Sequence, residues 1–158
     1  MRHNLSNNIL LNLNEDTINT ISLREVMKEV YNLLTDILGS SYMRKNDSKP
    51  KIKFDNLSNK NIGKCIRFQE ITYKGTKNCT NILISDLFKN SKYLTKEDLF
   101  KVILHEYLHS LKSCRGCGHD GEFAKIAQLI NSRTDYHVGT YVDDEVSLHY
   151  HYELNKNR

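Results

Sequence analysis

The chain has no tryptophan, one proline and no long uninterrupted run of apolar residues among its 158 residues. Apolar side chains near the start, at Ile9, Leu10, Leu11 and Leu13, are interrupted by asparagines, so no segment has the pattern of a signal peptide or a membrane span. We therefore expect a cytoplasmic protein with no membrane partner. Its four cysteines should then be reduced thiols or metal ligands rather than disulfides.

Hydrophobic residues make up 39% and charged residues 27% of the chain, proportions typical of folded rather than disordered proteins. This length predicts a single domain over residues 1–158, with a core at about 22–131 and a C-terminal extension at 132–158. The net charge of +4 is small. Lysines and arginines nonetheless gather between residues 45 and 67, which indicates a solvated basic surface or a weak association with DNA.

A capping pattern predicts the first helix. Ser22 and Glu25 have the spacing of a capping box, so the helix should begin at Ser22, and Gly39 can supply the positive-φ residue that closes it. Apolar residues recur between them at helical spacing and should face the core. These residues are Val26, Val30, Leu33, Leu34, Ile37 and Leu38.

Three short runs rich in β-branched and aromatic residues follow, at 51–54, 64–73 and 78–85. Residues 74–77 have the composition of a hairpin turn between the last two runs. The pattern predicts three strands, of which the last two are antiparallel neighbours. Cys65 and Cys79 fall within these runs and are expected to be packed thiols.

A second capping pattern, Thr95 with Asp98, predicts a helix over residues 99–111. Most of its circumference is apolar. Its polar side chains form one strip, in which Lys101, His105, His109 and Lys112 follow at spacings of four, four and three. A single polar strip on an otherwise buried helix is what the floor of a cleft requires.

The strip contains the pattern His105-Glu106-x-x-His109. Two histidines four residues apart on a helix point the same way and can bind one Zn²⁺ ion. Zinc makes a bound water more acidic, and a neighbouring carboxylate can remove its proton and pass it to the departing amine. The pattern therefore predicts peptide-bond hydrolysis with Glu106 as general base.

A catalytic zinc takes three protein ligands, so one more residue must come from elsewhere. His119 is the first candidate, because a short turn and the start of another helix, capped by Asp120, can present it. Glu122 is the second. Cys117 is the third, since a thiolate would make zinc a weaker Lewis acid.

The remaining chemistry-bearing residues leave alternatives open. Cys114 and Cys117 have the spacing of a zinc knuckle or a redox pair, although two free thiols in a tight turn are favoured. Residues 141–142 and 148–152 have strand-like composition. His149 and His151 alternate in the second of these segments. They are interpreted either as exposed residues or as additional substrate contacts.

In its motifs the chain resembles the SprT-like zinc metallopeptidases, which include the Spartan proteases of DNA–protein crosslink repair. The resemblance spans about residues 22–131. It is carried by Gly63-Lys-Cys65, Asn81-Ile-Leu-Ile-Ser-Asp-Leu87, Val102-Ile-Leu-His-Glu-Tyr-Leu-His109 and Gly118-His-Asp-Gly-Glu-Phe123.

This resemblance implies a zincin-like α+β domain with a leading helix, a small antiparallel sheet and a metal-binding helix pair. It also implies that His119 is the third zinc ligand, although Asp120 stands where the family usually has glycine. The four-cysteine zinc ribbon of many members has no counterpart here, so DNA binding assigned to that ribbon does not carry over.

The leading hypothesis is thus a zinc endopeptidase that acts on a protein substrate, with DNA-associated proteins as one class of target. The alternative is a non-catalytic module, stabilised by zinc, that binds nucleic acid or protein on a peptidase scaffold. The sequence does not indicate an oligomeric state.

Overall fold

The computed structural model describes residues 18–46 and 49–156, which form a mixed α+β fold. The general fold class predicted from the sequence is therefore confirmed. The apolar residues at 9–13 lie outside the described residues, so the expectation for that segment stays a prediction. In chain order the elements are α2 (Thr20–Leu38), α3 (Ser40–Arg44), β1 (Lys51–Asp55), β2 (Gly63–Thr72), β3 (Gly75–Ser85), η1 (Asp86–Phe88), α4 (Lys96–Ser110), η2 (Lys112–Cys114), α5 (Gly121–Arg133) and α6 (Asp144–Asn155).

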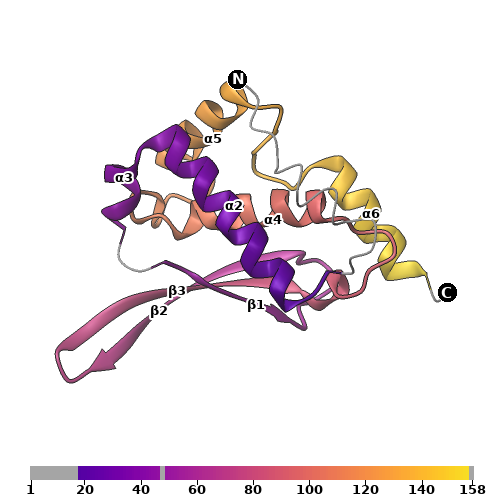
Figure 1. Cartoon of the computed structure of the whole chain (residues 1–158), viewed down its shortest axis with the longest axis horizontal. Helices are drawn as coiled ribbons and strands as arrows, with labels where there is room; N and C mark the ends of the chain where they lie inside the picture. Colours follow the sequence, from indigo (N-terminus) through magenta and orange to yellow (C-terminus); the bar gives the residue numbers. More distant parts are fainter. Residues whose placement is uncertain (1–17, 47–48, 157–158) are drawn as a thin grey trace.

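The helices lie on one side of the three-stranded sheet (Figure 1). α2 contacts β1, whereas α4 contacts β2 and β3 and also packs against α2, α5 and α6. α4 therefore runs through the centre of the molecule, and most of its side chains are buried. Among the described helices, none has both the length and the hydrophobicity to cross a membrane.

The sheet has the strand order β1-β3-β2 and is mixed, so the expectation of a wholly antiparallel sheet is wrong. β2 and β3 are antiparallel, but β1 pairs with β3 in parallel, with Lys51 opposite Asn81. The segment 56–62 reverses the chain between β1 and β2. Because β3 lies between them and is antiparallel to β2, β1 must run in the same direction as β3.

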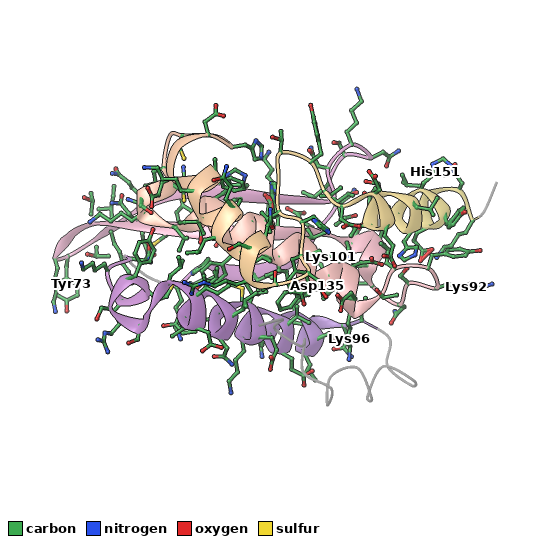
Figure 2. The ribbon with its side chains drawn as sticks, turned by 90° about the horizontal axis from the view of Figure 1, so that it is seen from above. Tyr73, Lys92, Lys96, Lys101, Asp135 and His151 are labelled. Atoms are coloured by element: carbon green, nitrogen blue, oxygen red, sulfur yellow. The ribbon has the colours of Figure 1, made fainter. Side chains whose placement is uncertain are left out.

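The hairpin between β2 and β3 turns at Tyr73 and Lys74, slightly before the predicted turn at 74–77. Thr72 pairs with Gly75, which closes the turn. Gly75 has a φ of +119°, a backbone conformation that glycine adopts readily because it has no Cβ atom. The hairpin projects beyond the helices (Figure 1). Tyr73 lies at its far end, away from Lys101 and the helices (Figure 2), and is 95% exposed.

The first described helix begins one turn earlier than the capping pattern indicated. Asn19, not Ser22, is its N-cap: the Asn19 side chain accepts a hydrogen bond from the Ser22 amide, and Ser22 Oγ accepts one from the Asn19 amide, both at 3.1 Å. Asparagine caps as well as serine, so two overlapping capping patterns compete. The structure also places Gly39 at the C-cap with a φ of +94°, as predicted.

The apolar stripe of α2 faces the core, as predicted. Val26, Val30, Leu33 and Leu34 are buried, while Ile37 and Leu38 pack at its margin. The same hydrophobic core reaches from Ile18 to Tyr150. The segment after residue 131 therefore contributes to one continuous core with the preceding elements.

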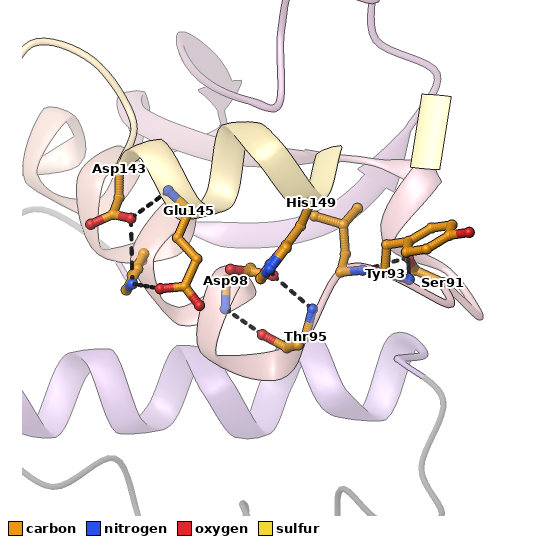
Figure 3. Close-up of polar contacts among 9 residues, drawn as sticks. Ser91, Tyr93, Thr95, Asp98, Asp143, Glu145 and His149 are labelled. Atoms are coloured by element: carbon orange, nitrogen blue, oxygen red, sulfur yellow. Dashed lines mark hydrogen bonds and ion pairs between the residues drawn. The ribbon is translucent and has the colours of Figure 1, made fainter. Parts of the chain in front are cut away.

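The strand-like composition at 141–142 and 148–152 is misleading, because residues 144–155 form the helix α6. Asp143 caps this helix by accepting a hydrogen bond from the Glu145 amide (Figure 3). Val146, Tyr150 and Glu153 recur at spacings of four and three and are buried. The cap and this spacing were the signals for a helix, but β-branched and aromatic composition obscured them.

α6 is fixed to the start of α4 by polar contacts (Figure 3). The predicted cap at Thr95 and Asp98 is present as a reciprocal capping box. Asp98 Oδ2 also lies 2.7 Å from His149 Nδ1. His149 therefore holds α6 in place and is part of neither a strand nor the histidine group, whereas His151 is exposed.

Candidate metal centre

α4 and the turn after it bring three histidines together. His105 and His109 lie one turn apart on the same face of α4. The chain then passes through η2 and a turn in which Gly116 and Gly118 have φ values of +73° and +58°. This turn places His119 immediately before α5, beside the two α4 histidines.

The three imidazoles fit one metal ion. His119 Nε2 is 3.2 Å from both His105 Nε2 and His109 Nε2, and the ligand atoms of all three residues lie within 4.8 Å of one another. Two nitrogens that each bind zinc at 2.0–2.1 Å in tetrahedral geometry are separated by roughly 3.3 Å. The observed spacing therefore needs little rearrangement to hold a metal ion.

Phe123 supports this group from α5. Its buried ring packs against all three imidazoles, with ring centroids 5.3 Å from His105, 4.6 Å from His109 and 5.0 Å from His119. An apolar ring in this position limits the rotation of the histidines and excludes water from one side. In the sequence, Phe123 was named only as the last residue of the stretch Gly118-His-Asp-Gly-Glu-Phe123 that carries the family resemblance.

The two histidines on α4 are held in the neutral form. Burial, followed by the neighbouring histidines, lowers the pKa of His105 to about 4. Burial, followed by His119 and then Arg67, lowers the pKa of His109 to about 4. Neutral imidazole is the form that binds a metal, so protons do not compete with the metal for these two ligands near pH 7.

Glu106 projects beside the histidine group and is only 8% exposed. Burial raises its pKa from 4.5 to about 7. No described side chain forms an ion pair with it. A buried carboxyl group with a pKa near neutrality can both accept and release a proton, which is what a general base that later acts as an acid requires.

The raised pKa has a measurable effect on the stability of the protein without metal. The carboxyl group binds its proton more tightly in the folded state than in the unfolded state. Its stabilising contribution to the free energy of unfolding is therefore fully present below pH 4.5 and is lost as pH rises through about 7. We expect Glu106→Gln to stabilise the chelated protein by up to roughly 3 kcal/mol at pH 8.5 and by much less at pH 5. Urea unfolding in EDTA at both pH values measures this difference, and an equal effect at both would contradict it.

Gly63 brings the edge strand β2 close to Glu106. A Cβ atom at this position would lie 2.7 Å from Val102 Cγ1 and 3.2 Å from Glu106 Cγ. Only glycine fits without displacing these side chains. The sequence indicated Gly63 through the family resemblance alone, because nothing local predicts which helix faces the start of the strand.

Two cavities meet at Gly63, Glu106 and His109, and together we call them the cleft. The histidine-side cavity, of about 410 Å³, also touches His105 and His119. The cysteine-side cavity, of about 440 Å³, also touches Cys65, Cys114, Gly116 and Gly118. The candidate metal centre is therefore accessible from both directions along β2.

The two lysines of the predicted polar strip do not join the histidine group. Lys101 Nζ lies 3.6 Å from Asp143 and 3.9 Å from Glu145, so it pairs with the start of α6. Lys112 lies in η2, where its amide donates to the Asn46 side chain. Only the middle of the strip therefore belongs to the group of histidines that could hold a metal ion.

The alternative third ligands lie outside the group of three histidines that the structure describes. All four cysteines are free. Cys117 donates a hydrogen bond to the Cys114 carbonyl oxygen at 2.9 Å, and burial raises the pKa of Cys114 to about 11. Burial also raises the pKa of Cys65 to about 11. The protonated thiols of Cys114 and Cys65 are poor metal ligands and weak nucleophiles at neutral pH.

Comparisons of the chain with protein-family models, with curated proteins and with solved structures find no match. We therefore infer its chemistry from the geometry of its residues. What that geometry provides is a group of three histidines able to hold a metal ion, a buried carboxyl group beside them and an open cleft.

Proposed function

We propose that this protein is a zinc-dependent endopeptidase of the SprT-like, zincin-like type. One observation carries the proposal: three histidine nitrogens suited to a single metal ion share a cleft with the buried carboxyl group of Glu106. A metal that only stabilised the fold would not need a carboxyl group of raised pKa beside it. Nor would it need a cleft on either side.

The donor set favours zinc. Three neutral imidazoles with one position left open are the ligands of many catalytic zinc ions. The hard oxygen ligands that magnesium and calcium prefer are absent from this group of three described residues. When bound, zinc would polarise the scissile carbonyl group and make a coordinated water more acidic.

Glu106 would accept a proton from the attacking water and deliver it to the nitrogen of the leaving amine. It lies on α4, one residue after His105, beside the three histidines but outside the group that could hold the metal ion. Its low exposure strengthens its electrostatic interaction with charge that develops in the cleft.

The edge strand β2 favours an extended peptide as the substrate. β3 pairs with one side of β2, and no other strand in the described part of the chain pairs with its second side. An extended peptide can add to such an edge through backbone hydrogen bonds. Since Gly63 at the start of β2 lies against Glu106, a peptide bound there would pass the candidate metal centre.

Metal dependence of proteolysis tests this proposal. The purified protein, loaded with one equivalent of zinc, should cleave an unfolded protein such as reduced, alkylated lactalbumin. Chelation should abolish cleavage, and added zinc should restore it. Bound zinc without cleavage of any unfolded protein or peptide library would contradict the enzymatic proposal.

One observation favours the alternative of a nucleic-acid-binding module. A groove of about 480 Å³ between α2 and β1 is lined by Arg24, Lys28, Lys49 and Lys51, and no acidic residue in the described part of the chain lines it. It also contains Tyr31, and a ring among cations suits the phosphates and bases of a nucleic acid. An enzyme that acts on DNA-associated proteins could use both the groove and the cleft.

The groove and the cleft lie on different sides of α4. Tyr107, which lines the groove, is two residues after His105 and therefore about 200° around the helix from it. Oligonucleotide binding by the Glu106→Gln variant tests the non-catalytic alternative. That alternative is favoured if the variant binds as tightly as the unmodified protein and the unmodified protein shows no cleavage in the proteolysis experiment.

A further inference from the structure

The charges that line the cleft are unequally distributed. Lys60 lines the histidine-side cavity, and Lys64 and Arg67 line the cysteine-side cavity. Among residues 18–46 and 49–156, Glu106 is the only acidic residue that lines either cavity. It is 8% exposed, whereas the side chains of the three cations are exposed. A molecule that enters the cleft therefore meets positive charge first.

All three cations belong to the same wall, formed by β2 and the segment that leads into it. Arg67 is held against α4, because its guanidinium donates a hydrogen bond to the His109 backbone carbonyl. That bond occupies one of its five N–H groups. Lys60 and Lys64 form no ion pair with a described residue, so their charges are available to a ligand.

We propose that the cleft selects acidic peptide segments, with aspartate or glutamate on both sides of the scissile bond. Lys60 flanks the candidate metal centre on the side of His119, and Arg67 flanks it on the side of Cys114. Carboxylates on both sides of the bond would each meet a cation. Peptides rich in lysine or arginine would be repelled from the same wall.

This inference rests on the proposed function, because it names the substrate class of the same cleft. It is nevertheless testable without turnover. Equilibrium binding can be measured on the zinc-loaded Glu106→Gln variant, in which the three cations are unchanged and a bound peptide is not consumed.

The probes are three fluorescein-labelled peptides of equal length that differ only in the residues flanking a central Ala-Leu bond, which are glutamate, glutamine or lysine. In about 50 mM salt we expect the glutamate peptide to bind about tenfold more tightly than the glutamine peptide, with the lysine peptide weakest. The double variant Lys60→Gln/Lys64→Gln should reduce this preference to below about threefold.

The matched control is Lys53→Gln/Lys125→Gln, made in the same Glu106→Gln background. Like the Lys60→Gln/Lys64→Gln variant, it removes two positive charges, but from exposed positions on β1 and α5 that line neither cavity. The preference should stay unchanged in this variant. Equal binding of the glutamate and glutamine peptides, or an equal loss in the control, would overturn the proposal.

Hydrolysis separates this inference from the proposed function. If the unmodified protein cleaves glutamine and lysine peptides with the same kcat/KM as glutamate peptides, the charge preference is wrong and the enzymatic proposal stands. If it cleaves no peptide while the glutamate peptide still binds preferentially, the enzymatic proposal is wrong and the acidic peptide site remains.

Discussion

Replacing Glu106 by glutamine is expected to lower peptide hydrolysis by at least about 10³-fold while the protein keeps its metal ion. Glutamine has nearly the same shape as glutamate but cannot accept the proton of the attacking water. Because the three histidines are untouched, the metal content should stay at one ion per chain. Hydrolysis of an unfolded protein and metal analysis of the same preparation measure both quantities.

Glu122→Gln is the matched control for this prediction. Glu122 is a carboxyl group near the candidate site, in the first turn of α5, but it lies outside the histidine group. Its replacement should leave hydrolysis within about threefold of the unmodified protein, a change of less than 1 kcal/mol in the barrier. Retained activity in a pure Glu106→Gln preparation would remove Glu106 from the mechanism.

Replacing His119 by alanine is expected to weaken zinc binding by at least about 100-fold, because removing a residue that merely orients a ligand already costs 10–100-fold. His119 Nε2 is 3.2 Å from each of the other two histidine nitrogens, so its loss leaves two ligands on one face. Competition with a chromogenic chelator measures the affinity. Hydrolysis should fall with zinc occupancy and recover in part at high zinc concentration.

His151→Ala controls for the loss of one imidazole. His151 is exposed on α6 and is not a member of the histidine group. Its removal should change zinc affinity by less than about twofold, since surface substitutions away from a site have small effects. If the His119→Ala protein binds zinc as tightly as the unmodified protein, Glu122 or Cys117 must supply the third ligand.

The two α4 histidines and Glu106 were predictable because their arrangement is local. A helix with a 3.6-residue period places residues four apart on the same face, whatever the rest of the fold does. The cap at Thr95 and Asp98 is equally local, since the two residues that bond to each other are three apart. Such features depend on short segments that the sequence displays directly.

Other features depend on partners far away in the chain. The parallel pairing of β1 with β3 joins Lys51 to Asn81, and no local pattern shows which strand will be its neighbour. Which residues of α6 are buried depends on the elements packed against it, such as α4. One contact between these two helices joins His149 to Asp98, which are 51 positions apart in the sequence. The choice of Asn19 rather than Ser22 as the N-cap of α2 is a local matter. It was still not predictable, because asparagine and serine are about equally good N-cap residues.

The sequence by itself determined the general α+β fold class, the apolar stripe of α2 and the placement of His105 and His109 on one face of α4, because helical periodicity and capping are short-range. Only the tertiary structure decided that His119 joins His105 and His109, that Gly63 brings β2 against Glu106, and that Lys60, Lys64 and Arg67 form one wall of the cleft. These relations arise from packing between segments distant in the chain. The hydrophobic core that unites the segments is specified by many residues together.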